Sequence, residues 1–149
     1  MKEKILEAFK TLGFEMEELE DFGYGFCYEG KKYLYLPNEE DEEFLNLAIP
    51  SVWDEEDEEL ISRSELNEKI NSTLKYVKAY KMVDSIWLVY ERALLSDEDL
   101  EPVIAHMIIH LDGAHTFLCK QAEEARKDDD EEEDIEDENT DVSDDSDEA

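Results

Sequence analysis

Residues 65–95 read ELNEKINSTLKYVKAYKMVDSIWLVYERALL, and the spacing of their apolar side chains changes part-way along. Leu66, Ile70 and Leu74 recur every four residues, which is the spacing of one face of an α-helix. From Tyr76 onward the segment is rich in aromatic and β-branched residues on both sides of an Asp-Ser pair, a pattern typical of two strands joined by a turn. The segment therefore predicts a helix that leads into a β-hairpin. It contains no group obviously poised for chemistry, so it indicates architecture rather than activity.

The residues before this segment predict one helix and three strands. An apolar stripe at helical spacing begins near the N-terminus, and Gly13 is expected to end that helix. Two aromatic-rich runs flank Glu29 and Gly30, which favours a tight hairpin. Pro50 indicates a bulge or an edge position near the end of a third strand. The expected elements are a helix over residues 2–12 and strands over residues 24–28, 31–36 and 44–53.

Capping signals mark the start of the two later helices. Ser62 and Glu65 have the spacing of a capping box at the start of the helix in residues 65–95. Pro102 is tolerated only in the first turn of a helix, so the last helix should begin near Asp99 or Glu101. The expected order is α-β-β-β-α-β-β-α. Because the strands come as hairpins, the fold class is predicted to be α+β, with an antiparallel sheet of about five strands and three helices.

The charge divides the chain into two parts. The chain has 149 residues, 45 Asp and Glu, 14 Lys and Arg, and a formal net charge of −31. Residues 128–149 contain 15 of these carboxylates, no Lys or Arg, and almost no apolar side chains. Such a segment cannot bury enough surface to offset its chain entropy. We therefore expect a folded α+β domain over residues 1–127 and a disordered acidic tail over residues 128–149.

The composition also excludes several classes of function. The net charge of −16 on residues 1–127 opposes direct binding to nucleic acid or to anionic lipid. The sequence has no apolar run long enough for a membrane span and no signal-peptide pattern. Cys27 and Cys119 are far apart in the sequence, which favours a reducing cytoplasm over a disulfide framework. No GxGxxG, GxxxxGK[ST], GxSxG or CxxC motif is present, so we predict a non-enzymatic protein with no cofactor.

The chain has more large aromatic side chains than a core built on three helices can hold. It contains two Trp, seven Tyr and six Phe. We therefore predict that some of them face a partner, since aromatic residues are enriched at protein interfaces. The candidate partner-binding residues are Trp53, Trp87, Tyr33, Tyr35 and Tyr80.

A family resemblance rests on the helix and hairpin quoted above. Asn67 and Asn71 lie one turn apart in LNEKINSTLKYVKAY, and the hairpin and a helix over residues 100–118 follow. With the element order and the acidic character, this pattern resembles the type III secretion chaperone-like fold, in particular the YbjN-like family of bacterial cytosolic proteins. The resemblance covers residues 1 to about 122. It implies a small, often dimeric, non-enzymatic domain that binds another polypeptide.

We accordingly expect a chaperone-like or adaptor protein in the cytoplasm, acting as a homodimer. Exposed aromatic side chains would contact a basic or amphipathic polypeptide, and the negative field would steer it. The acidic tail allows an alternative, in which it competes with nucleic acid for the basic surface of a nucleic-acid-binding protein. A purely solvating role for the tail is equally compatible with its composition.

Two pairs of side chains in the helices allow both a functional and a structural interpretation. His106 and His110 have the spacing of two metal ligands, but residue 107 is Met where an HExxH site needs Glu, so we predict no metal site. Asn67 and Asn71 could recognise the backbone of a partner through their amides. We favour the other interpretation, in which they satisfy backbone groups of an adjacent loop or strand.

Overall fold

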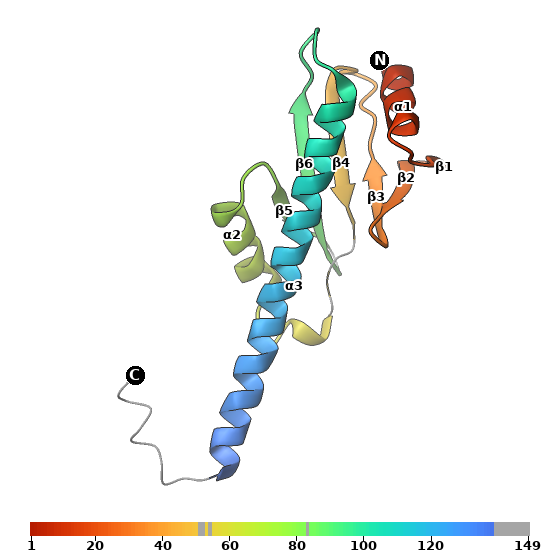
Figure 1. The fold of residues 1–149 in the computed structure, drawn as a ribbon. Coiled ribbons are helices and arrows are strands. Elements are labelled where there is room, and N and C mark those ends of the chain that lie inside the picture. Colours follow the sequence, from red (N-terminus) through yellow and green to blue (C-terminus); the bar gives the residue numbers. More distant parts are fainter. Residues whose placement is uncertain (51–52, 54, 83, 139–149) are drawn as a thin grey trace.

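The computed structural model describes residues 1–50, 53, 55–82 and 84–138. It confirms the α+β class, with three helices and an antiparallel sheet, but the sheet has six strands instead of about five (Figure 1). The elements are α1 (Lys2–Thr11), β1 (Glu17–Leu19), β2 (Gly23–Tyr28), β3 (Lys31–Tyr35), β4 (Phe44–Ile49), a short 3₁₀ helix η1 (Glu55–Asp57), α2 (Arg63–Thr73), β5 (Lys78–Lys81), β6 (Ile86–Ala93) and α3 (Leu100–Glu138).

All neighbouring strands are antiparallel, in the order β1-β2-β3-β4-β6-β5. The additional strand is β1, which pairs with Gly23–Gly25 of β2 and has the sequence EEL. Two glutamates in three residues give no apolar alternation, so nothing in the sequence predicts it. The turn that joins β1 to β2 needs a glycine at position 23, where φ is +86° and a Cβ atom would lie 2.3 Å from the Tyr35 carbonyl oxygen.

Two of the predicted helix signals are confirmed, one at the end of α1 and one at the start of α2. After α1 the chain turns at Gly13, whose φ is +95°. At the start of α2, the Ser62 hydroxyl oxygen accepts a hydrogen bond from the Glu65 N–H at 3.1 Å. Leu66 and Ile70 of the quoted segment are fully buried, so its helical stripe does face the core.

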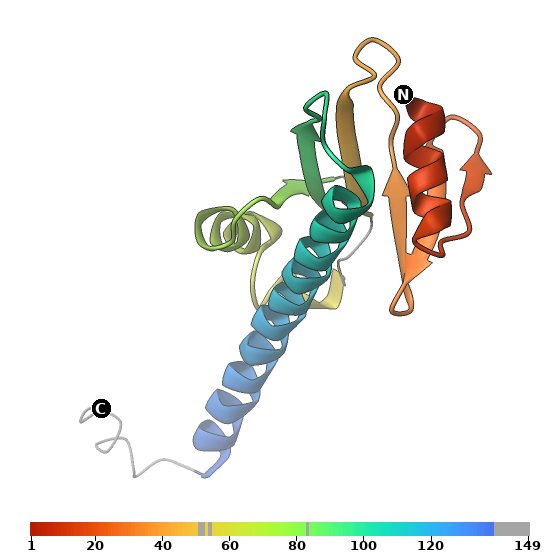
Figure 2. The ribbon, with the colours of Figure 1, turned by 45° about the horizontal axis from the view of Figure 1, so that its top comes forward.

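Helices α1 and α3 lie over the same face of the sheet, and α2 packs beside β5 and α3 (Figure 1, Figure 2). The hydrophobic core fills the space between this face and the helices. On β3, Tyr33 and Tyr35 point into it, and they are 0% and 2% exposed. Tyr33 stacks on Phe26 at a centroid distance of 5.3 Å, and Tyr35 lies 5.7 Å from Phe9 of α1.

Tyr33 and Tyr35 are therefore core residues, which corrects the expectation that they contact a partner. The reason is their place in the sheet. The strand β3 has neighbours on both sides, and alternation sends every second side chain of a strand to the face that the helices cover. Burial raises the pKa of the Tyr35 phenol to about 12, as expected for a group held away from water.

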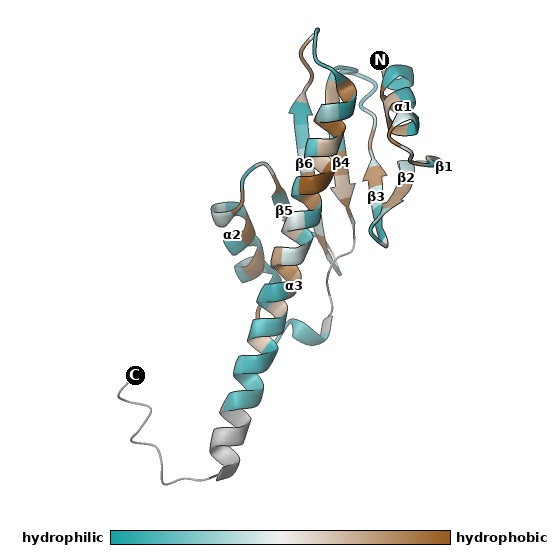
Figure 3. Cartoon of the chain, in the orientation of Figure 1, coloured by the Kyte–Doolittle hydropathy of each residue, from teal (hydrophilic) through white to brown (hydrophobic). Residues whose placement is uncertain are grey.

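The last helix is much longer than its apolar stripe. It continues through residues 128–138, which we expected to be disordered, so the boundary at Lys127 does not coincide with the end of the helix. Extending a helix that packing has already formed needs no new nucleus, and Glu is a good helix former. Where Figure 3 colours it, the part of α3 that projects past the sheet is mostly hydrophilic. Residues 139–149 of the predicted tail lie outside the described residues.

Among the helices that the structure describes, none combines the length and the apolar character that a membrane crossing requires.

Candidate functional site

The sheet face opposite α1 and α3 carries none of the helices described in residues 1–138 (Figure 2). Leu34, Ala48 and Val89 form a row across this face, because Ala48 pairs with both of the others. They are only 5%, 0% and 6% exposed, so the centre of the face offers no exposed apolar side chain. Exposed apolar side chains are found instead at its β5–β6 end.

Tyr80, Met82 and Trp87 form this exposed group, which we call the hairpin patch. Tyr80 of β5 lies directly opposite Trp87 of β6, so their side chains are neighbours on the same face. Tyr80 is 42% exposed and Met82 is 40% exposed, while Trp87 is partly buried. The N–H of Met82 donates to the Ser85 carbonyl at 2.8 Å and closes the hairpin. The structure thus brings together two of the predicted partner-binding residues, Trp87 and Tyr80.

The hairpin patch lies in the least acidic part of the chain. Residues 69–83 contain four lysines and no Asp or Glu. Lys75, Lys78 and Lys81 of this run are exposed. Lys78 shares the face of Tyr80, since the buried Ala79 lies between them in β5. The aromatic pair is thus bordered by Lys78, whose ammonium group lies 3.8 Å from the Glu91 carboxylate of β6.

The outer edge of β5 is closed by two side-chain amides of α2. The Asn71 Oδ1 atom accepts from the Ala79 N–H at 2.7 Å, and Asn71 Nδ2 donates to the Ala79 carbonyl at 3.2 Å. Asn67, with its amide oriented to satisfy both neighbours, accepts from the Lys81 N–H at 3.1 Å and donates to the Arg63 carbonyl at 3.2 Å. These contacts confirm the structural interpretation of the asparagine pair. They also prevent another strand from pairing with this edge, so contact at the hairpin patch must be made by side chains.

Trp53 is part of a different site. It is partly buried against the core and lines a cavity of about 220 Å³ with Asp57 of η1 and with residues of α3 that include His115 and Cys119. Asp57 is 3% exposed, and its carboxylate accepts two hydrogen bonds from the guanidinium of Arg126, one of them at 2.7 Å. This pairing holds η1 against α3, so the environment of Trp53 supports the fold and does not extend the hairpin patch.

Cys119 and His115 are neighbours on α3, a pairing that the sequence analysis did not identify although a four-residue spacing on a helix predicts it. Their sulfur and Nδ1 atoms are 3.8 Å apart. Burial raises the pKa of the Cys119 thiol and lowers the pKa of His115, so both groups favour their neutral forms. A neutral thiol is a poor nucleophile, so this geometry does not provide an activated cysteine.

His106 and His110 belong to a cluster of four rings. Their centroids are 4.0 Å apart, and Tyr76 stacks on Tyr90 beside them at 5.5 Å. His110 Nδ1 donates to the His106 carbonyl at 2.9 Å, and the Tyr90 hydroxyl bonds to His106 Nδ1 at 3.1 Å. Burial, followed by the nearby His110 and Arg92, lowers the pKa of His106. Within the described part of the chain, no three His, Cys, Asp or Glu side chains are placed to hold a metal ion.

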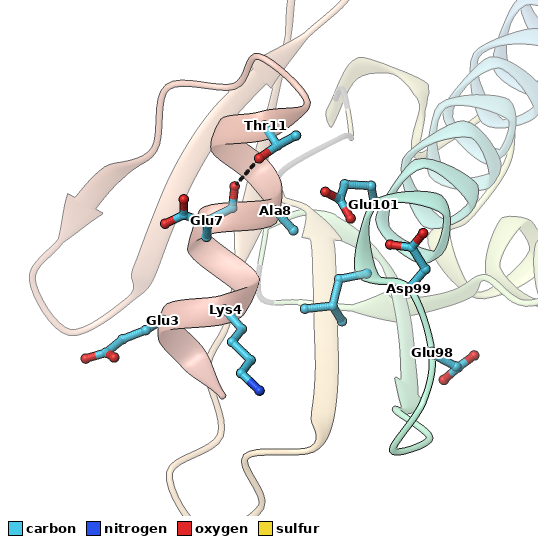
Figure 4. Close-up of a pocket in the computed structure, with 9 residues that line it drawn as sticks. Glu3, Lys4, Glu7, Ala8, Thr11, Glu98, Asp99 and Glu101 are labelled. Atoms are coloured by element: carbon cyan, nitrogen blue, oxygen red, sulfur yellow. Dashed lines mark hydrogen bonds between the residues drawn. The ribbon is translucent and has the colours of Figure 1, made fainter.

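A groove between α1 and the start of α3 is strongly acidic (Figure 4). Its volume is about 440 Å³, and five of its nine lining residues are carboxylates. Glu98 is held by the Arg92 guanidinium and the Leu95 N–H, and these hydrogen bonds lower its pKa. Carboxylates near the first turn of a helix are favoured by its dipole, which explains the group on α3 without a ligand. The lining residues are Glu3, Lys4, Glu7, Ala8, Thr11, Glu98, Asp99, Leu100 and Glu101.

Comparison with known proteins supports the fold alone. No protein-family model matches the chain, and no curated protein matches it. A crystal structure of an uncharacterized protein from Methanothermobacter thermautotrophicus is similar, with a TM-score of 0.63 and 16% sequence identity. The similarity covers 83% of this chain and 96% of that protein. The resemblance to the YbjN-like family therefore stays a prediction.

Proposed function

We propose that this protein is a non-enzymatic binding module, chaperone-like or adaptor in role, which contacts another polypeptide through the hairpin patch. The observation that carries the proposal is the exposed Tyr80 and Met82 beside Trp87 on a helix-free face. Exposed aromatic and Met side chains with few charges among them are characteristic of the centre of protein interfaces. Exposed charged residues such as Lys78 and Lys81 lie near the patch and suit the solvated rim of such an interface.

The expected partner is a basic or amphipathic polypeptide. A chain with a net charge of −31 repels acidic macromolecules and accelerates its encounter with basic ones. Apolar side chains of the partner would pack on Tyr80 and Trp87, where the closed edge of β5 excludes strand addition. We also propose the cytoplasm as the location and a homodimer as the working state. Static light scattering at several concentrations tests the dimer, and a mass of 17.4 kDa throughout would contradict it.

Site-specific cross-linking in the native cell tests the binding surface. A photoreactive phenylalanine analogue replaces Tyr80 in one variant and the exposed Ile109 of α3 in a control variant. We expect a discrete protein adduct from position 80 that is absent at position 109. In the position 80 background, Trp87→Ala should remove the adduct, while Leu95→Ala, at a 68% exposed residue, should leave it intact. Equal adducts at both positions, or an adduct unaffected by Trp87→Ala, would contradict the proposal.

One observation favours the alternative role as an acidic competitor of nucleic acid. The helix α3 includes residues 128–138, so ten of the 15 tail carboxylates lie on a continuous helical support. A basic nucleic-acid-binding surface could bind such a helix by charge alone. Deleting residues 128–149 distinguishes the two functions. Loss of the position 80 adduct after the deletion would favour competition by the tail, and its retention would favour the hairpin patch.

A further inference from the structure

The two histidines in the cluster of four rings have a hydrogen-bond partner at one ring nitrogen only. His110 Nδ1 donates to the His106 carbonyl at 2.9 Å, so this nitrogen carries the proton and His110 Nε2 carries a lone pair. His106 Nδ1 is occupied by the Tyr90 hydroxyl at 3.1 Å, and it has the same tautomer when the Tyr90 oxygen is the acceptor. Within the part of the chain that the structure describes, no hydrogen-bond partner reaches either Nε2 atom. Each ring thus keeps its Nε2 atom for a ligand.

The contacts at Nδ1 resemble those around histidines that bind a metal ion. Such an imidazole usually donates its second ring N–H to a carboxylate, a backbone carbonyl or water, which fixes the ring and its tautomer. Here the His106 carbonyl and the Tyr90 hydroxyl supply the two oxygens. The Tyr76 ring also packs nearly perpendicular to both imidazoles, at a centroid distance of 4.9 Å from each. The pair is therefore oriented before any ligand binds.

The separation of the two rings fits a square-planar ion better than a tetrahedral one. An ion about 2.0–2.1 Å from Nε2 lies about 3.2 Å from the centroid of the ring. Two imidazoles at the right angle of square-planar coordination then have centroids about 4.5 Å apart, and a tetrahedral angle needs about 5.2 Å. The centroids of His106 and His110 are 4.0 Å apart. A small opening of the pair therefore reaches the square-planar arrangement.

The surroundings of the pair accept a divalent cation. His106 is exposed and His110 is partly exposed, so a hydrated ion can reach both rings. Arg92 lies near His106, but its guanidinium is paired with the Glu98 carboxylate. Burial, followed by the nearby His110 and Arg92, lowers the pKa of His106, so this imidazole is neutral at pH 7, which is the form that binds a metal. The net charge of −31 also concentrates cations around the protein.

We propose that His106 and His110 bind one Ni²⁺ or Cu²⁺ ion through their Nε2 atoms. This departs from the expectation of no metal site, which rested on Met107 in place of the glutamate of an HExxH site. A square-planar ion needs no such glutamate, because water can fill its remaining positions. Imidazole suits both ions, and square-planar coordination by nitrogen and oxygen is typical of them. The site does not rest on the proposed binding function.

Isothermal titration calorimetry of the full chain with NiCl₂ tests the site, in an excess of Mg²⁺ that occupies the many carboxylates. We expect one Ni²⁺ per chain. His106→Gln and His110→Gln should each abolish this binding. His115→Gln, a control on the same helix outside the cluster, should leave it unchanged. Binding that survives in both cluster variants would show attraction to carboxylates only and would overturn the proposal.

Two further titrations test how the site is built. Tyr90→Phe removes only the hydroxyl that bonds to His106 Nδ1, so it should weaken Ni²⁺ binding about 10–100-fold while the circular dichroism spectrum is unchanged. An unchanged affinity would overturn the oriented pair. Zn²⁺ should bind more weakly than Ni²⁺, because the rings lie too close for a tetrahedral ion. The reverse order would overturn the square-planar assignment.

Proton NMR locates the ion directly, because the chain has only three histidines. Paramagnetic Ni²⁺ should broaden the ring signals of His106 and His110 at a lower concentration than those of His115. Equal broadening of all three would overturn the site. Half an ion per chain, with a doubled mass in light scattering, would show that a second copy completes the coordination and would overturn the site within one chain.

Discussion

Replacing Asn71 by Ala should destabilise the protein through the edge of β5. The substitution removes an acceptor 2.7 Å from the Ala79 N–H and a donor 3.2 Å from the Ala79 carbonyl. Each hydrogen bond contributes about 1 kcal/mol, and groups left partly buried and unpaired increase the loss. We therefore expect the free energy of unfolding to fall by about 2 kcal/mol. With an m-value of about 2 kcal/mol/M, the urea midpoint should fall by about 1 M.

Two further variants distinguish this mechanism from a general loss of polarity in α2. Asn71→Asp keeps an acceptor for the Ala79 N–H but places a second oxygen against the carbonyl, so it should be at least as destabilising as Asn71→Ala. Asn38→Ala also removes an oxygen that accepts two backbone N–H bonds, at 3.0 and 3.1 Å, but in an exposed turn where water replaces it. It should cost less than about 0.5 kcal/mol. Equal midpoints for Asn71→Ala and wild type, measured by urea titration of the circular dichroism signal, would refute the reasoning.

Three more changes test other contacts. Gly23→Ala should lower the free energy of unfolding by about 2–4 kcal/mol in thermal or urea unfolding, because residue 23 has a positive φ and an added Cβ would clash with the backbone of Tyr35. Gly113→Ala lies in an open position on α3 and should raise the free energy of unfolding by up to about 1 kcal/mol. Arg126→Ala should lower the free energy of unfolding by about 2 kcal/mol, because it removes the ion-pair partner of the buried Asp57 carboxylate. The loss is smaller than for a fully buried ion pair, because half of the arginine side chain is exposed. An unchanged urea midpoint would contradict this prediction. Because the pKa of His106 is lowered in the folded state, the unfolded state binds the proton more readily, and stability should fall as the pH drops below about 6.5. The variant His106→Gln should weaken this pH dependence of the free energy of unfolding. An identical pH profile for the variant would disprove the assignment.

The sequence predicts most elements of the fold because their signals are local. The N-cap at Ser62 and the apolar stripe of Leu66 and Ile70 act within a few residues, and the structure has both. The strand β1 could not be predicted, because its two glutamates are held there by pairing with β2 and not by burial. The extension of α3 past Lys127 depends on a preceding packed helix, which composition alone does not reveal.

The candidate site was predictable only in part. Tyr33, Tyr35, Tyr80 and Trp87 look alike in the sequence, since each is an aromatic residue in a strand. The face that each presents depends on which side the helices cover, and this is a property of the tertiary structure. Because side chains alternate along a strand, each aromatic residue can be assigned to one of the two faces of the sheet. Which face is buried is known only once the order of the strands in the sheet is known. The pairing of Cys119 with His115 was accessible from helical spacing alone.

The length of α3 has a consequence for how the protein behaves in solution. A helix of 39 residues is about 58 Å long, which is about twice the roughly 30 Å diameter of a small domain. A projecting rod that carries many like charges increases hydrodynamic drag well beyond that of a sphere of equal mass. The monomer should therefore elute early from a gel-filtration column and diffuse slowly, in the range of a compact dimer. Mass measured independently of shape is accordingly the meaningful readout for this chain, and truncation within α3 should shorten the Stokes radius far more than it lowers the mass.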